Sequence, residues 1–271
     1  MEKDAVRFAA LGALYFGDKP EFFRACLESL ALQTKQLPIF IVVDGPIGAE
    51  LESVIREYEE LNVQYLRRPD NNGLAAALQF GLRELEARFE YVIRFDSDDI
   101  NRSDRFEKMV NFVGRYDPDL CSAQMNEIDN EGNRFSKRTV PIQESKIKQW
   151  IAFRNPINHP AAVVKIRSAL CVGGYLEMPY FEDWYLWERM AGAGYKIMNS
   201  NEFLVDFRAT EEMVKRRFGP RYRSFERGFF SRRLKEGNTS RLLLLMSLFA
   251  RQIIKLLGFT AYKEIFFGLR K

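Results

Sequence analysis

Three aspartates follow an apolar run in the segment "VIRFDSDDI", residues 92–100. These are Asp96, Asp98 and Asp99. Carboxylates this close repel and raise one another's pKa, so the arrangement is costly unless a cation or hydrogen-bond donors lie among them. Mg²⁺ and Mn²⁺ prefer carboxylate oxygens together with the phosphate oxygens of a substrate. A solvated acidic turn is the alternative, but the apolar run before it favours a metal site.

The elements around this cluster alternate between two periods. Strand-like runs at 7–14, 39–43, 63–67 and 90–95 are separated by helix-like stretches at 20–32, 50–61 and 73–89. This alternation predicts an α/β fold with a mostly parallel central sheet and helices on both faces. Ligands of such sheets bind at the carboxyl ends of the strands. Asp44, which follows "IFIVV", is therefore expected at the same edge as Asp96.

The second half keeps the α/β character but loses the strict alternation. A helix is expected after residue 101 with Ser103 as its N-cap, then a strand at 120–125 and a turn at 129–133. A strand-like "HPAAVVKI" begins at His159, and a helix "EDWYLWERMAGAG" begins at Glu182 and Asp183. Carboxylates at a helix entrance are stabilised by the helix dipole.

Composition and charge narrow the class of protein. The chain of 271 residues is 46% hydrophobic, enough for one large domain with an appendage. Its three cysteines are widely spaced, which argues against a disulfide framework and a zinc site. No export signal is evident, and the uncharged apolar run 242–250 is short of the roughly 20 residues that span a bilayer. A cytoplasmic protein without a membrane span is expected.

Charge is distributed unevenly along the chain. Residues 208–271 hold 16 Lys or Arg against 5 Asp or Glu, a net charge of +11, whereas the whole chain carries +4. The segment that contains the candidate site is therefore acidic and the C-terminal segment is basic.

The motifs together resemble the family-2 glycosyltransferases of the GT-A fold. The resemblance runs in order through "ALYFGD", "QT" at 33–34, "IVVDGP", "NNGLAAALQFGL", "RFDSDDINRSDRFEKM", "HPAAVVKIRSALCVGGY" and "EDWYLWERMAGAGYK". It covers roughly the first 210 residues. The continuation "FRATEEMVKRRFGPRY" is similar to bacterial members that build exopolysaccharide or lipopolysaccharide, such as the amylovoran biosynthesis transferases.

The resemblance implies a nucleotide-diphosphosugar donor, with UDP expected, and a divalent metal, Mg²⁺ or Mn²⁺, under the diphosphate. Asp98 would be the main metal ligand, assisted by Asp99, and Asp96 would lie near the ribose. Asp44 would contact the base or ribose. Because Val43 replaces the first acid of the family motif, the backbone near Ala13 and Tyr15 would share in donor recognition. Asn71 and Gly73 would start a helix beside the nucleotide, or serve as an ordinary cap.

Inversion at the anomeric carbon requires a base on the face opposite the leaving group. Asp183 matches the expected general base, with Glu182 beside it. His159 would lie near the donor diphosphate and acceptor, although a lone histidine is more often structural. Trp184 and Trp187 could stack on a sugar, but their helical spacing is more typical of a core.

The change to a basic composition near Arg208 marks a boundary in the chain. We therefore expect a GT-A domain at 1–210 and a basic amphipathic helical extension at 211–271. On a helical wheel Arg241, Arg251, Lys255 and Lys263 share one side, which suits a helix lying on an anionic membrane surface. Packing on the protein's own core is the alternative, and Gly258 interrupts the helix in either case. A polyprenyl-diphosphate-linked saccharide acceptor, implied by the resemblance, would place the protein peripherally at the inner face of the cell membrane.

Three other functions are alternatives to that of a glycosyltransferase. A dehydrogenase is disfavoured because no G-x-G-x-x-G follows the first strand. A sugar-phosphate nucleotidyltransferase would carry a Gly-rich, Arg-containing loop at that place. A catalytically silent carbohydrate-binding or scaffold protein remains open. No nucleic-acid partner is expected. The hypothesis favoured by the sequence is an inverting transferase of cell-surface polysaccharide synthesis.

Overall fold

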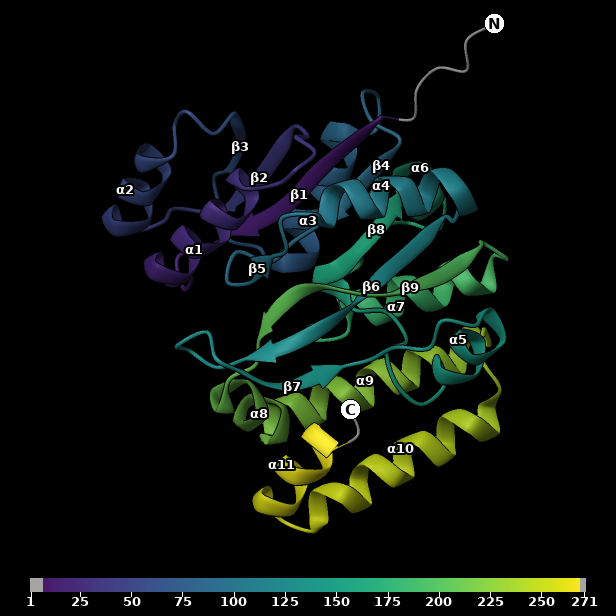
Figure 1. Ribbon diagram of the computed structural model, residues 1–271. Coiled ribbons are helices and arrows are strands. Elements are labelled where there is room, and N and C mark those ends of the chain that lie inside the picture. The colour runs from purple at the N-terminus through teal and green to yellow at the C-terminus, as the bar shows by residue number, and fades with distance from the viewer. Residues whose placement is uncertain (1–6, 269–271) are drawn as a thin grey trace, which may run out of the picture.

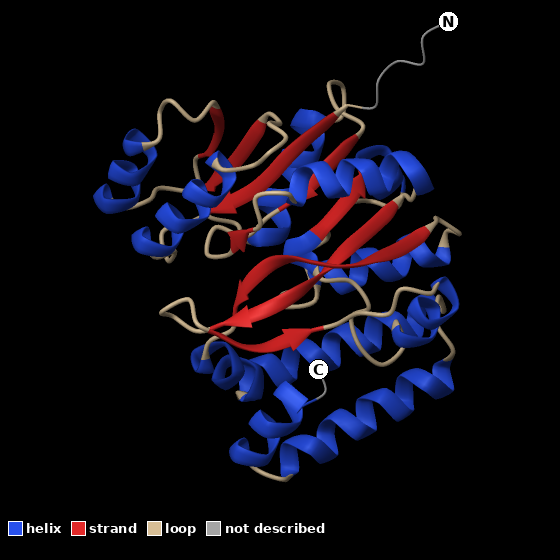
Figure 2. Ribbon diagram, in the orientation of Figure 1, coloured by secondary structure: helices blue, strands red, loops and turns tan. Residues whose placement is uncertain are grey.

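The computed structural model describes residues 7–268, which form one mixed β-sheet covered by helices on both faces (Figures 1 and 2). Within these residues the path through the sheet runs β3-β2-β1-β4-β8-β6-β9-β5, and β7 pairs with β6. The strands are β1 (Phe8–Leu14), β2 (Ile39–Asp44), β3 (Val63–Arg68), β4 (Tyr91–Arg94), β5 (Ile100–Asn101), β6 (Leu120–Ile128), β7 (Arg134–Arg138), β8 (Ala162–Lys165) and β9 (Ile197–Arg208).

The strands β3, β2, β1 and β4 pair in parallel, as the alternating pattern predicts. Register pairs Leu14 with Val43 and Leu11 with Arg94, so β1, β2 and β4 end at one edge of the sheet. Beyond β4 the sheet is mixed: β8 is antiparallel to both β4 and β6, and β9 is parallel to β6. The α/β prediction is confirmed, and the antiparallel β8 explains why the strict alternation lapses.

Two hydrophobic cores lie on opposite faces of the sheet. The first contains residues of α1 (Pro20–Ala31), α2 (Ala49–Glu57) and α4 (Arg105–Tyr116). The second contains residues of α3 (Leu74–Leu85), α6 (Ile166–Cys171) and α7 (Glu182–Gly192). Successive residues of β1 pack in different cores, as Ala10 and Leu11 do, because successive side chains of a strand point to opposite faces.

Two of the C-terminal helices, α9 (Pro220–Glu236) and α10 (Arg241–Leu256), extend the second core, and α5 (Glu144–Trp150) lies near them (Figure 1). The other two, α8 (Glu211–Phe218) and α11 (Phe259–Gly268), pack in a smaller third cluster that contains Met213, Val214 and Tyr262. Phe229 and Phe230 of α9 and Leu244 of α10 are fully buried in the same cluster as Trp184. Gly258, with φ +90°, separates α10 from α11, as the sequence indicates. No helix within residues 7–268 is both long and apolar enough to cross a bilayer.

Two local predictions are wrong in detail. α4 begins after Asp104 rather than Ser103, and the amide of Phe106 donates instead to Oε1 of Gln33 at 3.0 Å. The side chain of Gln33, just after α1, thus caps α4. This gives the glutamine of the "QT" motif a structural role. His159 does not begin a strand. It begins a short 3₁₀ turn, η1 (His159–Ala161), which precedes β8.

Candidate active site

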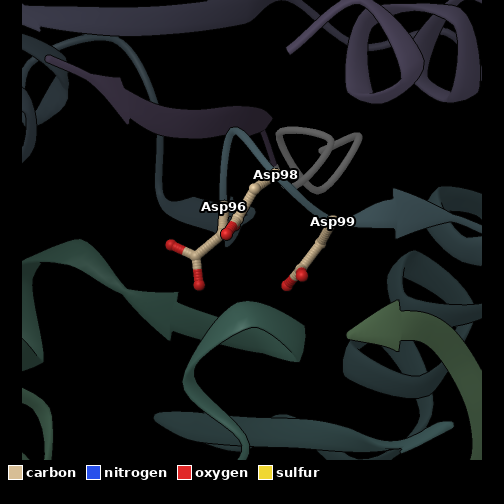
Figure 3. A group of neighbouring side chains, drawn as sticks. All are labelled: Asp96, Asp98 and Asp99. Carbon is tan, nitrogen blue, oxygen red and sulfur yellow. The ribbon is translucent and has the colours of Figure 1, made fainter. Parts of the chain in front are cut away.

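The acidic cluster lies in the loop after β4, at the edge where β1 and β2 also end. One carboxylate oxygen each of Asp96, Asp98 and Asp99 lies within 4.8 Å of the others. Figure 3 shows the three side chains leaving this loop. The three carboxylates are therefore close enough together to share one cation.

Asp99 is the deepest member of the cluster. Its Oδ1 accepts the amide of Arg208 at 2.8 Å, and Arg208 Nε donates to the carbonyl of Asp98 at 3.1 Å. The side chain is 1% exposed, yet its Oδ2 has no hydrogen-bond partner among the described residues. Burial, then Asp98, raises the pKa of Asp99 well above its usual value. A buried carboxylate with an unpaired oxygen beside two others fits a divalent cation, which would favour its charged form.

A fourth carboxylate, Asp18, joins the cluster. Its Oδ2 accepts from the hydroxyl of Ser97 and the amide of Tyr15, each at 3.0 Å. Burial is the main cause that raises the pKa of Asp18 to about 6. Burial, then Asp96 and Asp18, raises the pKa of Asp98 to about 7. Asp18 is part of the "ALYFGD" motif, but no role was predicted for it, and its place after the first strand was the available signal.

Arg94 connects the cluster to the lone histidine. This buried arginine of β4 donates to Asp96 Oδ1 and, from Nε, to Nε2 of His159 at 3.3 Å. The same Nε2 lies 2.9 Å from the hydroxyl of Tyr175. Because Nε2 accepts a hydrogen bond, the ring proton is assigned to Nδ1. Burial, then Arg94, lowers the pKa of His159 well below its usual value, so the imidazole is neutral.

Asp44 organises the loop before α3. Its Oδ2 accepts the amide of Gly73 at 2.8 Å, and Arg68 donates to its Oδ1. Gly45, with φ +82°, brings the chain so close to Asn71 that a Cβ at this glycine would lie 2.6 Å from the Asn71 amide nitrogen. The structure thus brings Asp44, Asn71 and Gly73 together. Asp44 itself is 2% exposed and holds this loop in place, so any contact of its side chain with a nucleotide stays a prediction.

The end of β1 supplies the remaining predicted donor residues. Ala13 is partly buried, and Tyr15 is 40% exposed beyond the strand end. The amide of Tyr15 is held by Asp18, which fixes this loop beside the acidic cluster.

Glu182 and Asp183 form a second acidic group at the start of α7. Asp183 accepts from the amide of Trp184 and from Nδ2 of Asn155, each at 2.6 Å. Burial, then Asp183, raises the pKa of Glu182 to about 8. Burial raises the pKa of Asp183 as well, but hydrogen bonds from Trp184 and Asn155 oppose that rise, so Asp183 is the member of the pair that ionises more readily.

Cations surround this second group. Arg138 of β7 and Arg217 of α8 both favour the charged form of Asp183, and burial lowers the pKa of Arg138 to about 10. No role was predicted for Asn155, Arg138 or Arg217, because each reaches the site only through tertiary packing.

Burial raises the pKa of the Tyr175 hydroxyl, and the charges of Asp183, Glu182 and Asp96 raise it further, so both acidic groups act on this one side chain. Next to Glu182, a cleft of about 340 Å³ separates the start of α3, at Gly73, from the start of α7. Trp184 and Trp187 do not line it. They are 3% and 0% exposed and belong to the core, as their spacing favours.

Comparison with solved structures assigns the fold to the GT-A glycosyltransferases. The structure of Staphylococcus aureus TarS in complex with UDP-GlcNAc superposes with a TM-score of 0.66 at 17% identity, over 90% of this chain and 72% of that chain. A mannosyltransferase from Pyrobaculum calidifontis, in complex with GDP-Man and Mn²⁺, gives 0.64 at 15% identity, over 90% and 68%.

The chain belongs to glycosyl transferase family 2, whose model matches residues 16–172. It is 36% identical to an Escherichia coli UDP-Gal:alpha-D-GlcNAc-diphosphoundecaprenol beta-1,3-galactosyltransferase, over 82% of this chain and 81% of the relative. It is 33% identical to the amylovoran biosynthesis glycosyltransferase AmsE of Erwinia amylovora, over 79% and 81%. The predicted family is therefore confirmed, and the nucleotidyltransferase and dehydrogenase alternatives are set aside.

Proposed function

We propose that this chain is a metal-dependent, inverting glycosyltransferase that moves a hexose from a UDP-sugar to a polyprenyl-diphosphate-linked saccharide in bacterial surface-polysaccharide synthesis. The observation that carries the proposal is the presence of two separate acidic groups, Asp96–Asp99 in the loop after β4 and Glu182–Asp183 at the start of α7. The first suits a cation and a diphosphate, and the second suits a base. The E. coli relative uses UDP-Gal and a diphosphoundecaprenol-linked acceptor by its name, which supports both substrate classes.

Asp98 and Asp99 would hold Mg²⁺ or Mn²⁺, and Asp96 would lie toward the donor, held by Arg94. The unpaired Oδ2 of Asp99 supports this assignment. A cation bound there would stabilise the negative charge that develops on the departing diphosphate. Ala13, Tyr15 and the loop held by Asp44 would bind the nucleotide. Neutral His159 would act through Arg94, which positions Asp96.

Asp183 would take the proton of the acceptor hydroxyl as that oxygen attacks the anomeric carbon. Both of its oxygens accept hydrogen bonds, from Trp184 and Asn155, which orient the carboxylate. Glu182, protonated at neutral pH, would avoid a second negative charge beside the base. The C–O bond to the acceptor forms as the bond to the diphosphate breaks, so the product is a glycoside of inverted configuration plus UDP.

The test is a transfer assay with a panel of UDP- and GDP-sugars, with and without Mn²⁺, and a short-chain prenyl-diphosphate-linked sugar as acceptor. We expect metal-dependent product of inverted anomeric configuration, as read by NMR. Nucleotide-sugar binding without transfer to any acceptor would instead favour the silent carbohydrate-binding alternative.

The membrane proposal needs a correction from the structure. Two of the four predicted cations turn toward α9: Lys255 is 5% exposed and donates to buried Glu226, to which Arg251 donates at 3.0 Å. Arg241 is exposed at the start of α10, and Lys263 of α11 pairs with Glu211. Lys255 and Arg251 are therefore engaged within the protein rather than with headgroups. The outward side is apolar. The exposed residues of α10 and its C-cap after Arg241 are Leu242, Leu245, Met246, Phe249, Ala250, Ile253, Leu256 and Leu257.

We propose that this apolar side of α10 enters the interface of the cytoplasmic leaflet, peripherally, while the net positive charge of residues 208–271 attracts anionic lipid. Deleting 240–271 would uncover the core around Leu244, so point substitutions are the better test. Phe249→Gln with Leu245→Gln should reduce sedimentation with anionic liposomes. Leu32→Gln, at a residue 71% exposed on α1's end, is the control. Unchanged liposome binding would reject the proposal, and a loss of self-association would assign the face to a second copy.

A further inference from the structure

An aromatic surface lies in the cleft beside Glu182 and has no role in the mechanism above. Tyr180 precedes α7 by two residues and is 40% exposed. Its ring centroid lies 5.2 Å from that of Tyr222 and 5.9 Å from that of Phe225, both on α9. Tyr180 and Phe225 line the cleft together with Arg221 and Glu182.

The backbone at Tyr180 is unusual. Its φ of +69° places a non-glycine residue in the left-handed region. Such conformations are costly for a bulky side chain and are concentrated at ligand-binding sites. The segment from Tyr175 to Phe181 leads into α7, which begins with Glu182 and the proposed base Asp183. Aromatic contacts with Tyr222 and Phe225 hold the ring of Tyr180 against α9.

We propose that Tyr180 and Phe225 form the platform on which the acceptor's sugar ring stacks, and that Arg221 binds the phosphate attached to that sugar. The inference rests on the proposed function and deepens it by naming the acceptor subsite. Three features carry it. The platform shares its cleft with Glu182, the neighbour of the proposed base Asp183. It offers exposed aromatic carbon to the apolar face of a sugar, and the cation Arg221 lines the same cleft.

Arg221 is placed for the phosphate. Its guanidinium carbon lies 5.9 Å from the Phe225 ring centroid, it is exposed, and it lines the same cleft. The proposed function assigns the donor diphosphate to the acidic cluster after β4, and none of Asp96, Asp98 and Asp99 lines the cleft beside Glu182, so a second phosphate site there suits the acceptor. A guanidinium binds phosphate through paired, charge-assisted hydrogen bonds.

The experiment uses the full chain and a short-chain prenyl-diphosphate-linked sugar. Tyr180→Gly removes the ring and suits a positive φ, so the loop is not strained by the change. We expect it to raise the acceptor KM about tenfold or more, whereas Tyr180→Phe keeps the wild-type value. The matched control is Tyr116→Ala at the end of α4, on the opposite edge of the sheet from the acidic cluster.

A second arm separates the acceptor's phosphate from that of the donor. Arg221→Ala should raise the KM of the diphosphate-linked acceptor strongly but that of a benzyl glycoside of the same sugar only slightly, and the Kd of UDP should not move. If Tyr180→Gly or Arg221→Ala weakens UDP binding and leaves acceptor KM unchanged, the platform belongs to the donor and the inference is overturned.

Direct binding distinguishes this inference from the proposed function. Calorimetry of the acceptor with the UDP-bound protein measures the platform even where no transfer occurs. Weaker acceptor binding by Tyr180→Gly than by wild type would support the platform in the absence of catalysis. Equal acceptor Kd for wild type and Tyr180→Gly would overturn it, whatever the transfer assay gives.

Discussion

Arg94 donates from Nε to Nε2 of His159 at 3.3 Å, and its other nitrogens hold Asp96 and the carbonyl of Phe95. One buried side chain thus couples the aspartate loop after β4 to the η1 turn before β8. The only histidine of the chain acts as an acceptor for this arginine, and its neutral state is a consequence of burial beside that cation.

The first prediction concerns this pair. His159→Ala should lower the free energy of unfolding by about 1–3 kcal/mol, because it leaves Arg94 Nε without its buried acceptor. It should also weaken donor binding through the position of Asp96. His159→Gln retains an acceptor and should recover part of both losses. Urea unfolding and UDP titration measure the two effects, and an alanine variant with wild-type stability would contradict the coupling.

The second prediction concerns the metal. Asp98→Asn should abolish most Mn²⁺-dependent donor binding and leave the fold intact, since the change also removes repulsion from Asp96 and Asp18. Calorimetry of the UDP-sugar with and without Mn²⁺ is the measurement. Glu131→Gln, in the exposed β6–β7 turn, is the control for an ordinary surface acid. Full turnover by Asp98→Asn would remove Asp98 from the metal site.

The third prediction concerns the base. Asp183→Asn should reduce transfer by a factor of about 10²–10⁴, the usual contribution of a positioned base. The Kd of the donor should stay near wild type, because Asp183 lies away from the aspartate loop and is held by Asn155 and Trp184. Single-turnover transfer and donor titration measure the two quantities. Loss of donor affinity with normal transfer per bound donor would place Asp183 in the donor site instead.

The fourth prediction follows from the pKa of Glu182, which burial raises from 4.5 to about 8. The folded state therefore binds more protons than the unfolded state between these values. The stability from protonated Glu182 is complete below pH 4.5 and is lost as pH rises toward 8. Glu182→Gln mimics the protonated acid, so its Tm relative to wild type should increase from about pH 5 to about pH 8.5. A pH-independent difference would contradict the raised pKa.

The fifth prediction concerns the ion pair between α9 and α10. Glu226→Leu should cost about 3–5 kcal/mol of stability, because it leaves Lys255 buried without its carboxylate. The double variant Glu226→Leu with Lys255→Met should be more stable than the single one, since no unpaired buried ammonium remains. Arg251, which also contacts Glu226, is unchanged in both. Denaturant unfolding of the three proteins measures the difference.

Much of the fold and of the acidic site was predictable from the sequence. The strands β1, β2 and β4 are short, almost continuously buried and mostly apolar runs, and the carboxyl ends of parallel strands share one edge, so the strand pattern alone places Asp44 and Asp96 there. The helical pattern likewise places Asp183 at a helix start. Arg94 and Asp18 were missed because their roles depend on contacts with His159 and Ser97 that only tertiary packing creates.

The orientation of α10 shows a different limit. Helical periodicity correctly grouped Arg251 and Lys255 on one side. It could not say which side faces the protein, and polarity favoured the solvent. Buried Glu226, 25 to 29 residues earlier on α9, decides the matter by attracting both cations inward. A pattern within one helix carries no information about a charge on its neighbour.

Helices α9 and α10 share the second core with α3 and α7, and Arg208 at the end of β9 holds the aspartate loop. This has a consequence for recombination between relatives. A crossover placed near residue 210 would separate Phe229 and Leu244 from the Trp184 surface that they cover. Exchange of acceptor preference by swapping the C-terminal helices would therefore require the matching α7 as well, so these two segments should be inherited as a unit.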